Sequence, residues 1–550
     1  MGKGLRKNRG IRMIIKHLKK RIIIFTLLIL VNFLIVTYTG IGYHALVQED
    51  ELREKYKFSR ILGGVKEDVG YAIDIDSQDR VVITGNTEST DFPVLMAYDP
   101  SYNGPTEIYF EGDAFIASFF PNGTLYWSTF FGGSLSDVGS DLIIDSQDNI
   151  IITGSTESTD LPILNGFDSN LDGREDAFLA KFSSNGELIW STFIGDIGSD
   201  TGMGVTIDSF NNIFVTGRWE ATPIGNNKWD AFIAKYTPNG DLEWLQKVGG
   251  SLSDYGIAVT LDSQENPLIS GITGSSDFPN DNNYYGGQQD IFIVKMNSTG
   301  EILWSNVIGG SENDFSNSIK VDKENHIVIT GWTFSSDYPT LNAYNLISNG
   351  IEDIIVSKFN ENGTMLWSTY LGGSHNEWAG KSHIDDIGNI YITGETFSMD
   401  YPLSNTSQSY LLSGTAQAYL TILDSTGFPQ WSETFGAIKG SYIWDRGTAL
   451  TTDSENNVII VGFTESRYFP MTTNDKFIGA YEVFLCSLYN PFEERPLMST
   501  STFSTTQQST TVTTTSTSNI ENTINITSGF LVAITLIALK IPTWKKRRTD

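Results

Sequence analysis

The chain has one cysteine, Cys486, and five histidines in 550 residues. A single cysteine excludes an internal disulfide and a cysteine-rich zinc site. His326, His375 and His383 have no serine or cysteine partner at the spacing of a nucleophilic site, and no phosphate-binding loop or dinucleotide fingerprint occurs. We therefore expect no enzyme, although paired carboxylates are common enough to leave glycoside hydrolysis open.

Positive charge is also scarce. The 36 Lys and Arg residues stand against 65 Asp and Glu, a formal net charge of −29, which argues against a nucleic-acid partner. Proline is low at 16, glycine is high at 52, and 12% of residues are aromatic. That composition suits strands and turns, and it excludes a chain that is disordered throughout.

The basic residues that do occur gather at the two ends. Residues 1–21 hold nine Lys or Arg and no acid, the apolar run 22–39 follows, and 40–56 are interpreted as a linker. This order is typical of a transmembrane signal anchor, and a cleaved signal peptide stays open as the alternative. Either one exports the chain that follows.

The other end shows the reverse order. A Ser/Thr-rich stretch at 491–525 predicts an extended stalk, 526–544 is an apolar run close to spanning length, and 545–550 is a basic tail. The positive-inside rule then places both basic ends in the cytoplasm and the acidic middle outside the plasma membrane. Glycosylation triplets fit export and lie at Asn122, Asn297, Asn362, Asn405 and Asn525.

The middle of the chain is an internal repeat with four landmarks. A double glycine begins at Gly63, Gly132, Gly195, Gly249, Gly309, Gly372 and Gly436, with Asp196 and Ala437 as its second residue in two copies. A Thr-Gly or its equivalent ends at Gly85, Gly154, Gly217, Gly271, Gly331, Gly394 and Gly462. An Asp-Ala-Phe-like triplet begins at Asp113, Asp176, Asp230, Asp290, Asp353, Gln417 and Glu482. The fourth landmark is Trp127, Trp190, Trp244, Trp304, Trp367 or Trp431.

Nearly all length variation lies in one segment of each repeat. The double glycine precedes Thr-Gly by 22 residues in six copies, and the triplet precedes the next double glycine by 19 residues in all six measurable cases. The segment from Thr-Gly to the triplet varies from 13 to 28 residues. Such a variable loop on a fixed scaffold is where repeat folds usually carry a binding surface.

The pattern of each repeat predicts four short strands joined by tight turns, one of them at 145–149. The residue that ends this turn is expected to take the left-handed conformation, and we assign it to Asn149, Asn212, Asn266, Asn325, Asn389 and Asn457. Seven such units predict an all-β, seven-bladed β-propeller of four-stranded antiparallel blades over 57–490, flanked by the two transmembrane segments. The last repeat lacks a fourth strand, and residues 57–64 match one. We therefore expect them to pair with residues 483–488 and close the ring.

Several motifs resemble the SBBP-type β-propeller repeat. They are Trp-Ser-Thr-Tyr-Leu-Gly-Gly-Ser at 367–374, Asp-Ser-Gln-Asp-Asn at 145–149, Ser-Thr-Asp-Phe-Pro at 89–93 and Asp-Ala-Phe-Ile-Ala-Lys at 230–235. The resemblance covers residues 57–490. It implies the propeller fold and an exported bacterial or archaeal protein, with no assigned catalysis.

The propeller face that carries the variable segments is also rich in acids. The crossover between repeats contains Asp68, Asp137, Asp200, Asp254, Asp314, Glu377 and Asp445, and the variable segments contain Asp91, Asp160, Asp277, Asp337 and Asp400. These carboxylates predict either a ligand-binding acidic face or, as the plainer interpretation, side chains that cap turns in every blade.

One acidic loop differs from the repeat. Asp168, Asn170, Asp172 and Asp176 place oxygen ligands around Gly173, in a pattern that resembles the calcium loops of integrin-type propellers. Calcium is therefore the one metal hypothesis that the sequence supports, and an ordinary polar loop is the alternative.

Aromatic residues have two interpretations. The repeated tryptophans are expected to pack between blades. Unrepeated aromatics of the variable segments could instead stack on sugars: Tyr98, Tyr102, Tyr109, Phe110, Tyr284 and Tyr285. The expected function is a cell-surface, membrane-anchored binding or adhesion module with an extracellular protein or glycan ligand. An anchored polysaccharide hydrolase or lyase and a structural envelope protein are the alternatives.

Overall fold

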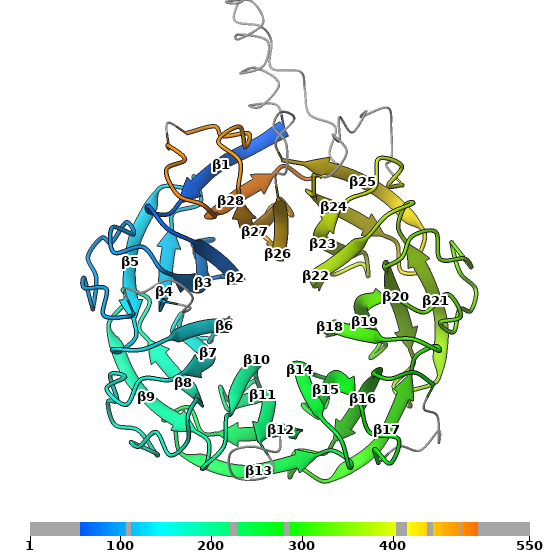
Figure 1. Cartoon of the computed structure of the whole chain (residues 1–550), viewed down its shortest axis with the longest axis horizontal. Coiled ribbons are helices and arrows are strands. Elements are labelled where there is room, and N and C mark those ends of the chain that lie inside the picture. The colour runs from blue at the N-terminus through cyan, green and yellow to red at the C-terminus, as the bar shows by residue number, and fades with distance from the viewer. Residues whose placement is uncertain are drawn as a thin grey trace, which may run out of the picture. The chain divides into compact units, whose positions relative to one another are not determined.

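The computed structural model describes residues 55–105, 112–220, 228–279, 286–402, 415–436, 444–473 and 475–492. All of them belong to one compact unit that ends at Phe492. Seven four-stranded antiparallel sheets stand around a central opening (Figure 1). The predicted seven-bladed propeller is thereby confirmed.

Blades 1 to 7 are numbered in chain order, and each has an inner, a second, a third and an outer strand. The inner strands are β2 (Asp68–Ile75), β6 (Asp137–Ile144), β10 (Thr201–Ile207), β14 (Asp254–Leu261), β18 (Asp314–Val321), β22 (Glu377–Ile384) and β26 (Asp445–Thr452). The second strands are β3 (Val81–Thr87), β7 (Ile150–Thr156), β11 (Ile213–Glu220), β15 (Pro267–Thr273), β19 (Ile327–Thr333), β23 (Ile390–Thr396) and β27 (Val458–Thr464). The third strands are β4 (Asp113–Phe119), β8 (Asp176–Phe182), β12 (Trp229–Tyr236), β16 (Asp290–Met296), β20 (Asp353–Phe359), β24 (Gln417–Leu423) and β28 (Glu482–Leu488). The outer strands are β5 (Leu125–Phe131), β9 (Leu188–Ile194), β13 (Leu242–Val248), β17 (Ile302–Ile308), β21 (Met365–Leu371), β25 (Pro429–Phe435) and β1 (Tyr56–Leu62).

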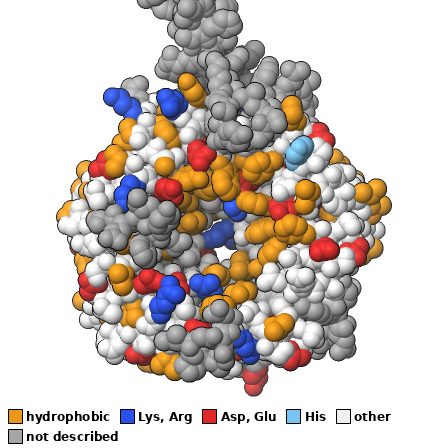
Figure 2. Space-filling view, in the orientation of Figure 1, with side chains coloured by type: hydrophobic (Ala, Val, Ile, Leu, Met, Phe, Trp, Pro, Cys, Tyr) orange, Lys and Arg blue, Asp and Glu red, His pale blue; other side chains and the backbone are white. Residues whose placement is uncertain are grey.

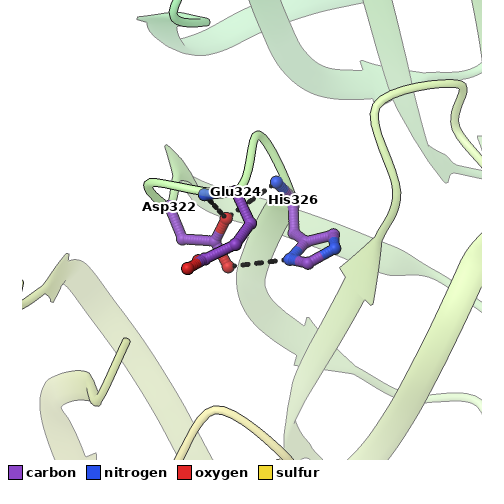
Figure 3. Close-up of side chains that lie close together, drawn as sticks. All are labelled: Asp322, Glu324 and His326. Carbon is purple, nitrogen blue, oxygen red and sulfur yellow. Dashed lines mark hydrogen bonds and ion pairs between the residues drawn. The ribbon is translucent and has the colours of Figure 1, made fainter. Parts of the chain in front are cut away.

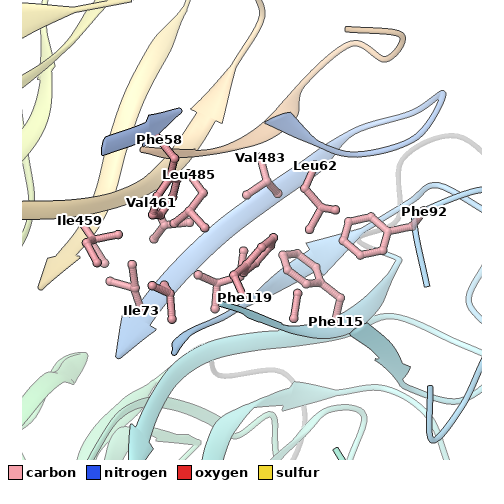
Figure 4. Close-up of a cluster of buried hydrophobic side chains, with 14 of the residues drawn as sticks. Phe58, Leu62, Ile73, Phe92, Phe115, Phe119, Ile459, Val461, Val483 and Leu485 are labelled. Atoms are coloured by element: carbon pink, nitrogen blue, oxygen red, sulfur yellow. The ribbon is translucent and has the colours of Figure 1, made fainter. Parts of the chain in front are cut away.

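The ring closes as the sequence predicts. Strand β1, from the start of the propeller, pairs antiparallel with β28, from its end, so blade 7 has the order β1-β28-β27-β26. Phe58 and Leu62 of β1 pack with Val483 and Leu485 of β28 and with residues of blade 1, including Phe119 (Figure 4). The closing strand therefore belongs to a hydrophobic core shared by the first and last blades.

The Thr-Gly landmark is explained by close backbone contact. A Cβ added to Gly85 would lie 1.9 Å from the carbonyl oxygen of Val69 on the neighbouring inner strand, and the same clash recurs in the other blades. At this point the inner strand carries a β-bulge, for example between Gly70 and Ala72. Glycine on the second strand thus lets each inner strand bulge toward the axis of the ring.

The repeated tryptophans pack between blades, as expected. Trp127 of blade 1 donates its indole N–H to the carbonyl oxygen of Ser184 in blade 2, at 3.0 Å, and its ring lies over Gly186. Trp190, Trp244, Trp304 and Trp367 repeat this contact with the next blade. Phe58 occupies the same position against Gly123.

The variable segments lie partly elsewhere than expected. In blade 1 the segment runs back along the outer strand, where Leu95 and Ser128 exchange both backbone hydrogen bonds, and Leu341 and Ser368 do the same in blade 5. In blade 7 the backbone N–H of Thr472 donates to Ser59 of β1. These segments cover free strand edges, which is a structural task that the sequence pattern does not predict for them.

The prediction for the left-handed turn residue was wrong by one position in five of its six copies. Positive φ occurs one residue before the end of the turn, at Asp79, Asp148, Asn211, Glu265, Asn325, Gly388 and Asn456. The residue that ends the turn instead uses its side chain, as when Asn149 donates to both carboxylate oxygens of Asp145. Asn325 does take positive φ as predicted, because His326 ends that turn in blade 5.

The predicted segments 1–21, 22–39, 526–544 and 545–550 lie outside the described residues, as do nearly all of the 40–56 linker and the 491–525 stalk. Among the residues that the structure describes, no helix is long and apolar enough to cross a membrane.

Candidate functional site

The seven bulges of the inner strands build a cavity on the axis of the ring. Each bulge turns one residue, or two in blade 6, toward the channel, and a cavity of about 360 Å³ lies between them. Its lining comprises Tyr71, Ser140, Met203, Ile257, Asn317, Gly380, Lys381 and Thr448 from the bulges, with Val138, Arg446 and Phe463 beside them. A cavity of this size falls within the range of small-molecule sites.

Aromatic side chains surround only part of the mouth of this cavity. We call Tyr255, Phe315, Trp332, Trp378, Trp444 and Phe463 the aromatic arc; all are half-buried and belong to blades 4 to 7. Neighbouring rings contact one another, with centroids 5.2 Å apart for Phe315 and Trp332 and 6.2 Å apart for Trp378 and Trp444. In the view of Figure 2, hydrophobic side chains gather around the central opening and Lys or Arg side chains lie within it.

Blades 1 to 3 have no aromatic residue at the equivalent positions, although Trp229 of blade 3 contacts Tyr255 at the end of the arc, with ring centroids 6.1 Å apart. Their equivalent cross-strand pairs are Val69 with Asn86, Val138 with Ser155, and Thr201 with Arg218. The scaffold is nearly sevenfold, so this difference between two sides of the mouth is not required by the repeat. It is the kind of local departure that a binding site needs.

Two carboxylates accept hydrogen bonds from tryptophans of the arc. The Trp378 indole donates to Glu352 and the Trp444 indole donates to Glu395. Burial raises the pKa of Glu352, and burial, opposed by Arg446, raises the pKa of Glu395 to about 7. Glu395 is fully buried. These acids therefore hold the indoles in place and do not themselves face a ligand.

Charged side chains also reach across the channel. Lys381 of blade 6 reaches Asp141 of blade 2 and also donates to the carbonyl oxygen of Ser140 at 3.2 Å. Lys320 of blade 5 makes no hydrogen bond or ion pair with any described residue, and burial lowers its pKa. His383, also on an inner strand, has its pKa lowered to about 4 by burial and by Lys320, so it is neutral near pH 7.

The repeated acids of the loop face are mostly structural. The seven crossover acids are fully buried, and Asp137 accepts the backbone N–H of Gly133 at 2.7 Å. Asp160 of a variable segment accepts the N–H of Ser134 at 2.8 Å, which holds its pKa below the usual value. The plainer interpretation of turn capping is confirmed. An acidic ligand face built from the crossover residues was wrong, because their carboxylates do not reach the surface.

A second row of acids pairs with the first. A Cβ added to Gly132 would lie 2.7 Å from Asp137 Oδ2 and 2.8 Å from Asp113 Oδ1, and the equivalent glycine of five other crossovers lies between two acidic side chains in the same way. Six junctions hold such a pair: Glu482 with Asp68, Asp113 with Asp137, Asp176 with Asp200, Asp230 with Asp254, Asp290 with Asp314, and Asp353 with Glu377. The first glycine of the double-glycine landmark is thus required by a buried carboxyl pair in six copies, and in the seventh Gly436 lies against Asp445 alone.

Asp322, Glu324 and His326 form a group of potential metal ligands that sequence reasoning did not single out (Figure 3). Asp322 accepts the backbone N–H of His326 at 2.8 Å, the ring Nδ1 of His326 lies 3.1 Å away, and the buried Lys358 ammonium is 2.8 Å away. Asn149 and Lys181 make the same contacts to Asp145 in blade 2. His326 therefore stands in for a turn-closing asparagine, which explains the group without a metal.

This interpretation predicts that Asp322→Asn destabilises the protein by about 3 kcal/mol, because buried Lys358 loses its charged partner. His326→Asn, which restores the residue of the other blades, should stay within about 0.5 kcal/mol of the parent. Urea unfolding of both variants measures this. The group would be a metal site instead if His326→Asn were much less stable than the parent and if zinc or manganese stabilised the parent but not the variant.

The predicted calcium loop is only partly assembled. Asp176 Oδ2 accepts the backbone N–H of Asp172 at 3.0 Å, and Asp168 Oδ1 accepts that of Asn170 at 3.1 Å. In the described part of the chain, the group of acids and histidines whose ligand atoms all lie within 4.8 Å of one another does not include Asp168, Asp172 or Asp176. Calcium binding at this loop stays a prediction.

Calcium should then raise the melting temperature more than magnesium does, because a ligand of the folded state stabilises it by about 2.7 kcal/mol at a hundred times its dissociation constant. Magnesium controls for general screening of this acidic chain. Asp172→Ala should abolish the calcium-specific increment. Equal effects of the two ions, or an unchanged response of the variant, would leave this loop as a polar turn.

The variable-segment aromatics contribute little to the channel. Tyr98 packs edge-on against Phe182, and the Tyr102 hydroxyl donates to the carbonyl oxygen of Pro105. Tyr109, Phe110, Tyr284 and Tyr285 lie outside the described residues. Sequence reasoning missed the aromatic arc. Each member follows a crossover acid or the glycine of the Thr-Gly landmark, except Trp444, which precedes Asp445.

Comparison with known proteins agrees with the fold. The family pattern described as a beta-propeller repeat, SBBP, matches residues 189–218, which run from β9 of blade 2 to β11 of blade 3. This segment carries the SBBP β-propeller repeat. An uncharacterized WD repeat-containing protein of Acanthamoeba polyphaga mimivirus is 24% identical over 293 residues, and the match covers 44% of this chain but only 21% of that relative.

Solved structures show other propellers. The Pan2 WD40 domain of Neurospora crassa matches with a TM-score of 0.39 and 10% identity, over 79% of this chain and 97% of that one. Sqt1 from Chaetomium thermophilum matches with a TM-score of 0.39 and 9% identity, over 79% of this chain and all of that one. At these scores the two structures carry no information about the function of this chain.

Proposed function

We propose that this chain is a membrane-anchored binding module of the cell surface, and that its propeller takes a glycan at the mouth of the central channel. The observation that carries the proposal is the aromatic arc, which occupies blades 4 to 7 and contacts Trp229 of blade 3, on one side of a nearly symmetric ring. Sugar rings have apolar C–H faces that stack on aromatic rings, and half-buried tryptophans keep such a face available.

The geometry favours binding over hydrolysis. A hydrolase needs a carboxyl group that touches the glycosidic oxygen and a second one at a defined distance. Glu395, with its pKa near neutrality, is fully buried behind Trp444, and neither Glu352 nor Glu395 lines the cavity. These features support a binding module.

Glycan arrays probed with the purified protein test the ligand class. Trp378→Ala and Phe315→Ala should each weaken binding by about ten- to a hundredfold, the usual effect of removing an aromatic contact residue at the centre of a site. Phe210→Ala is the matched control, because Phe210 is 73% exposed in the tight turn between β10 and β11. Binding that is unchanged in both arc variants would refute the mouth as the site.

The basic ends and apolar runs of the sequence support anchoring. We expect protease added to intact cells to remove the propeller and to spare an epitope placed at residues 547–550. Loss of that epitope from sealed cells, or its absence from the mature protein, would contradict the C-terminal anchor.

A further inference from the structure

The charge inside the cavity is opposite to that of the whole protein. The chain has a formal net charge of −29, yet the charged side chains that line the cavity are Lys381 and Arg446, both cations. Their anionic partners, Asp141 and Glu395, are not part of the lining. The surface that a ligand would meet in the cavity is therefore positive.

Arg446 has unused hydrogen-bonding capacity. Its guanidinium lies over the ring of Trp378, 5.6 Å from the centroid, and its only ion pair among the described residues is a 3.4 Å contact from Nη1 to Glu395. Its buried Nε has no hydrogen-bond partner in the described part of the chain. A guanidinium presents five donors in a planar fork that suits a carboxylate, so this arginine can bind one more anionic group.

The second cation is held in place from the opposite side of the ring. Lys381 is fixed by Asp141 and by the carbonyl oxygen of Ser140, both on β6. Lys320 adds a further ammonium that interacts electrostatically with Asp141 and with Asp74. Asp141 thus interacts with both lysines, and it holds the Lys381 ammonium at the edge of the cavity.

We propose that the cavity binds the carboxylate of an acidic sugar, with Arg446 and Lys381 as its ligands. This inference rests on the proposed function, since it assigns the class of glycan that the mouth takes. The aromatic arc receives the apolar ring face, and the two cations behind it receive the carboxylate. The bulge residues Met203 and Ile257 supply an apolar wall for the part of the sugar that lies between the aromatic arc and the two cations.

A second arginine has the same kind of surroundings as Arg446 but lies outside the cavity lining. Arg218 of blade 3 lies over Trp229, 5.5 Å from the ring centroid, and pairs with Glu175 at 3.5 Å. It resembles Arg446 in both contacts, but it does not line the cavity. Arg218 therefore provides a matched control for the loss of an arginine at the mouth.

The test is calorimetric titration of the purified full chain with oligogalacturonate and with its methyl ester, which keeps the sugar rings and removes the charge. The free acid should bind about ten- to a hundredfold more tightly than the ester, the usual effect of a charge-assisted contact. Arg446→Gln and Lys381→Met should abolish this preference, and Arg218→Gln should keep it. Arg446→Lys, which retains the charge but loses the fork, covers the case in which a neutral variant fails to fold.

The outcomes separate this inference from the proposed function. Acid and ester that bind equally well, with binding lost in Trp378→Ala, would overturn the carboxylate site and leave the glycan module standing. A preference for the acid that persists in both Arg446 variants would also overturn it. Galacturonic acid monomer that binds as tightly as the oligomer would support the site and identify its ligand as a free sugar acid. Tighter binding of the oligomer would identify the ligand as an acidic polysaccharide.

Discussion

Removal of residues 57–64 should abolish the soluble, folded ring. These residues hold nearly all of β1, the outer strand of blade 7, whose partner β28 lies at the far end of the propeller in sequence. Without β1, β28 loses its edge partner and blade 7 keeps three strands. An exposed edge of this kind promotes association between chains.

The expected loss is large because β1 is deeply buried. Phe58, Ile61 and Leu62 are each no more than 4% exposed. Burying a large apolar side chain contributes roughly 1.5–3 kcal/mol, so these three together supply about 5–9 kcal/mol. That is comparable with the whole stability of a typical domain, about 5–15 kcal/mol. We expect aggregation, or a fall in the melting temperature that exceeds that of any point variant described above.

Transposition provides the matched control. Residues 57–64 are moved to follow Asn490, joined by the turn sequence of residues 183–187 that links β8 to β9. The strand then reaches β28 from the other end, and solubility and melting temperature should largely recover. A soluble deletion variant that unfolds at the parent's temperature would show that β1 does not close the ring.

The sequence predicted the fold well because the repeat fixes it many times over. Seven copies of the same landmarks made strand number, blade number and ring closure a matter of spacing, and errors in one copy did not affect the others. The third copy shows why spacing succeeds where single residues do not. In its double-glycine landmark, Asp196 replaces the second glycine. This copy also lacks the Ser-x-Asp segment that packs on that glycine in other blades, as Ser158 and Asp160 pack on Gly133.

The candidate site was harder to predict, for a physical reason. The sequence pattern placed it in the variable segments, where length changes, but several of these cover strand edges instead. The site lies at positions that occur at a fixed spacing in every repeat but carry different residue types from blade to blade, such as Trp378, Arg446 and Phe463. Their meeting around one axis depends on the bulge of each inner strand, and a bulge leaves no clear mark in a single sequence.

The carboxyl pairs between blades predict the second large effect, a protein that becomes more stable as the pH falls from 8 to about 5. Burial raises the pKa of Asp113 to about 7 with Asp137 beside it, and raises the pKa of Asp176 and Asp200 to about 7. In a further pair, Asp314 has a pKa of about 7, raised by burial and by the neighbouring charge of Asp290. Two carboxyls in one buried site cannot both ionise without cost, so one member of each pair holds a proton near neutrality.

Unpaired atoms and one substitution support a shared proton. Oδ1 of Asp113, Asp176 and Asp353 is buried and has no hydrogen-bond partner among the described residues, as expected when the missing hydrogen belongs to the neighbouring carboxyl. At the one remaining junction Gln417 replaces the aspartate opposite Asp445. An amide always has the N–H that a carboxyl has only when protonated.

The sign of the pH dependence follows from the direction of these shifts. A carboxyl whose pKa rises from 3.8 in the unfolded chain to about 7 in the folded one stabilises the fold below pH 4, and this contribution is lost as the pH rises through 7. Each such proton contributes a slope of about 1.4 kcal/mol per pH unit between those values. Turn acids shift the other way: Lys358 opposes burial and holds the pKa of Asp322 below its usual value. Their contribution is lost below about pH 4, so the stability maximum should lie near pH 4–5.

Urea unfolding of the parent and of Asp113→Asn between pH 5 and 8 tests the shared proton. The new amide would keep the acceptor for the Asn103 N–H, which lies 2.8 Å from Asp113 Oδ2 in the parent, and would supply an N–H toward Asp137 without taking up a proton. The variant should therefore be more stable than the parent at pH 8 and lose about one proton's share of the slope. Asp160→Asn, a change at an exposed capping acid whose pKa is already low, should lower stability equally across this range. A parent whose stability is flat or rises between pH 5 and 8 would show that these pairs are ionised, and that some other cation balances them.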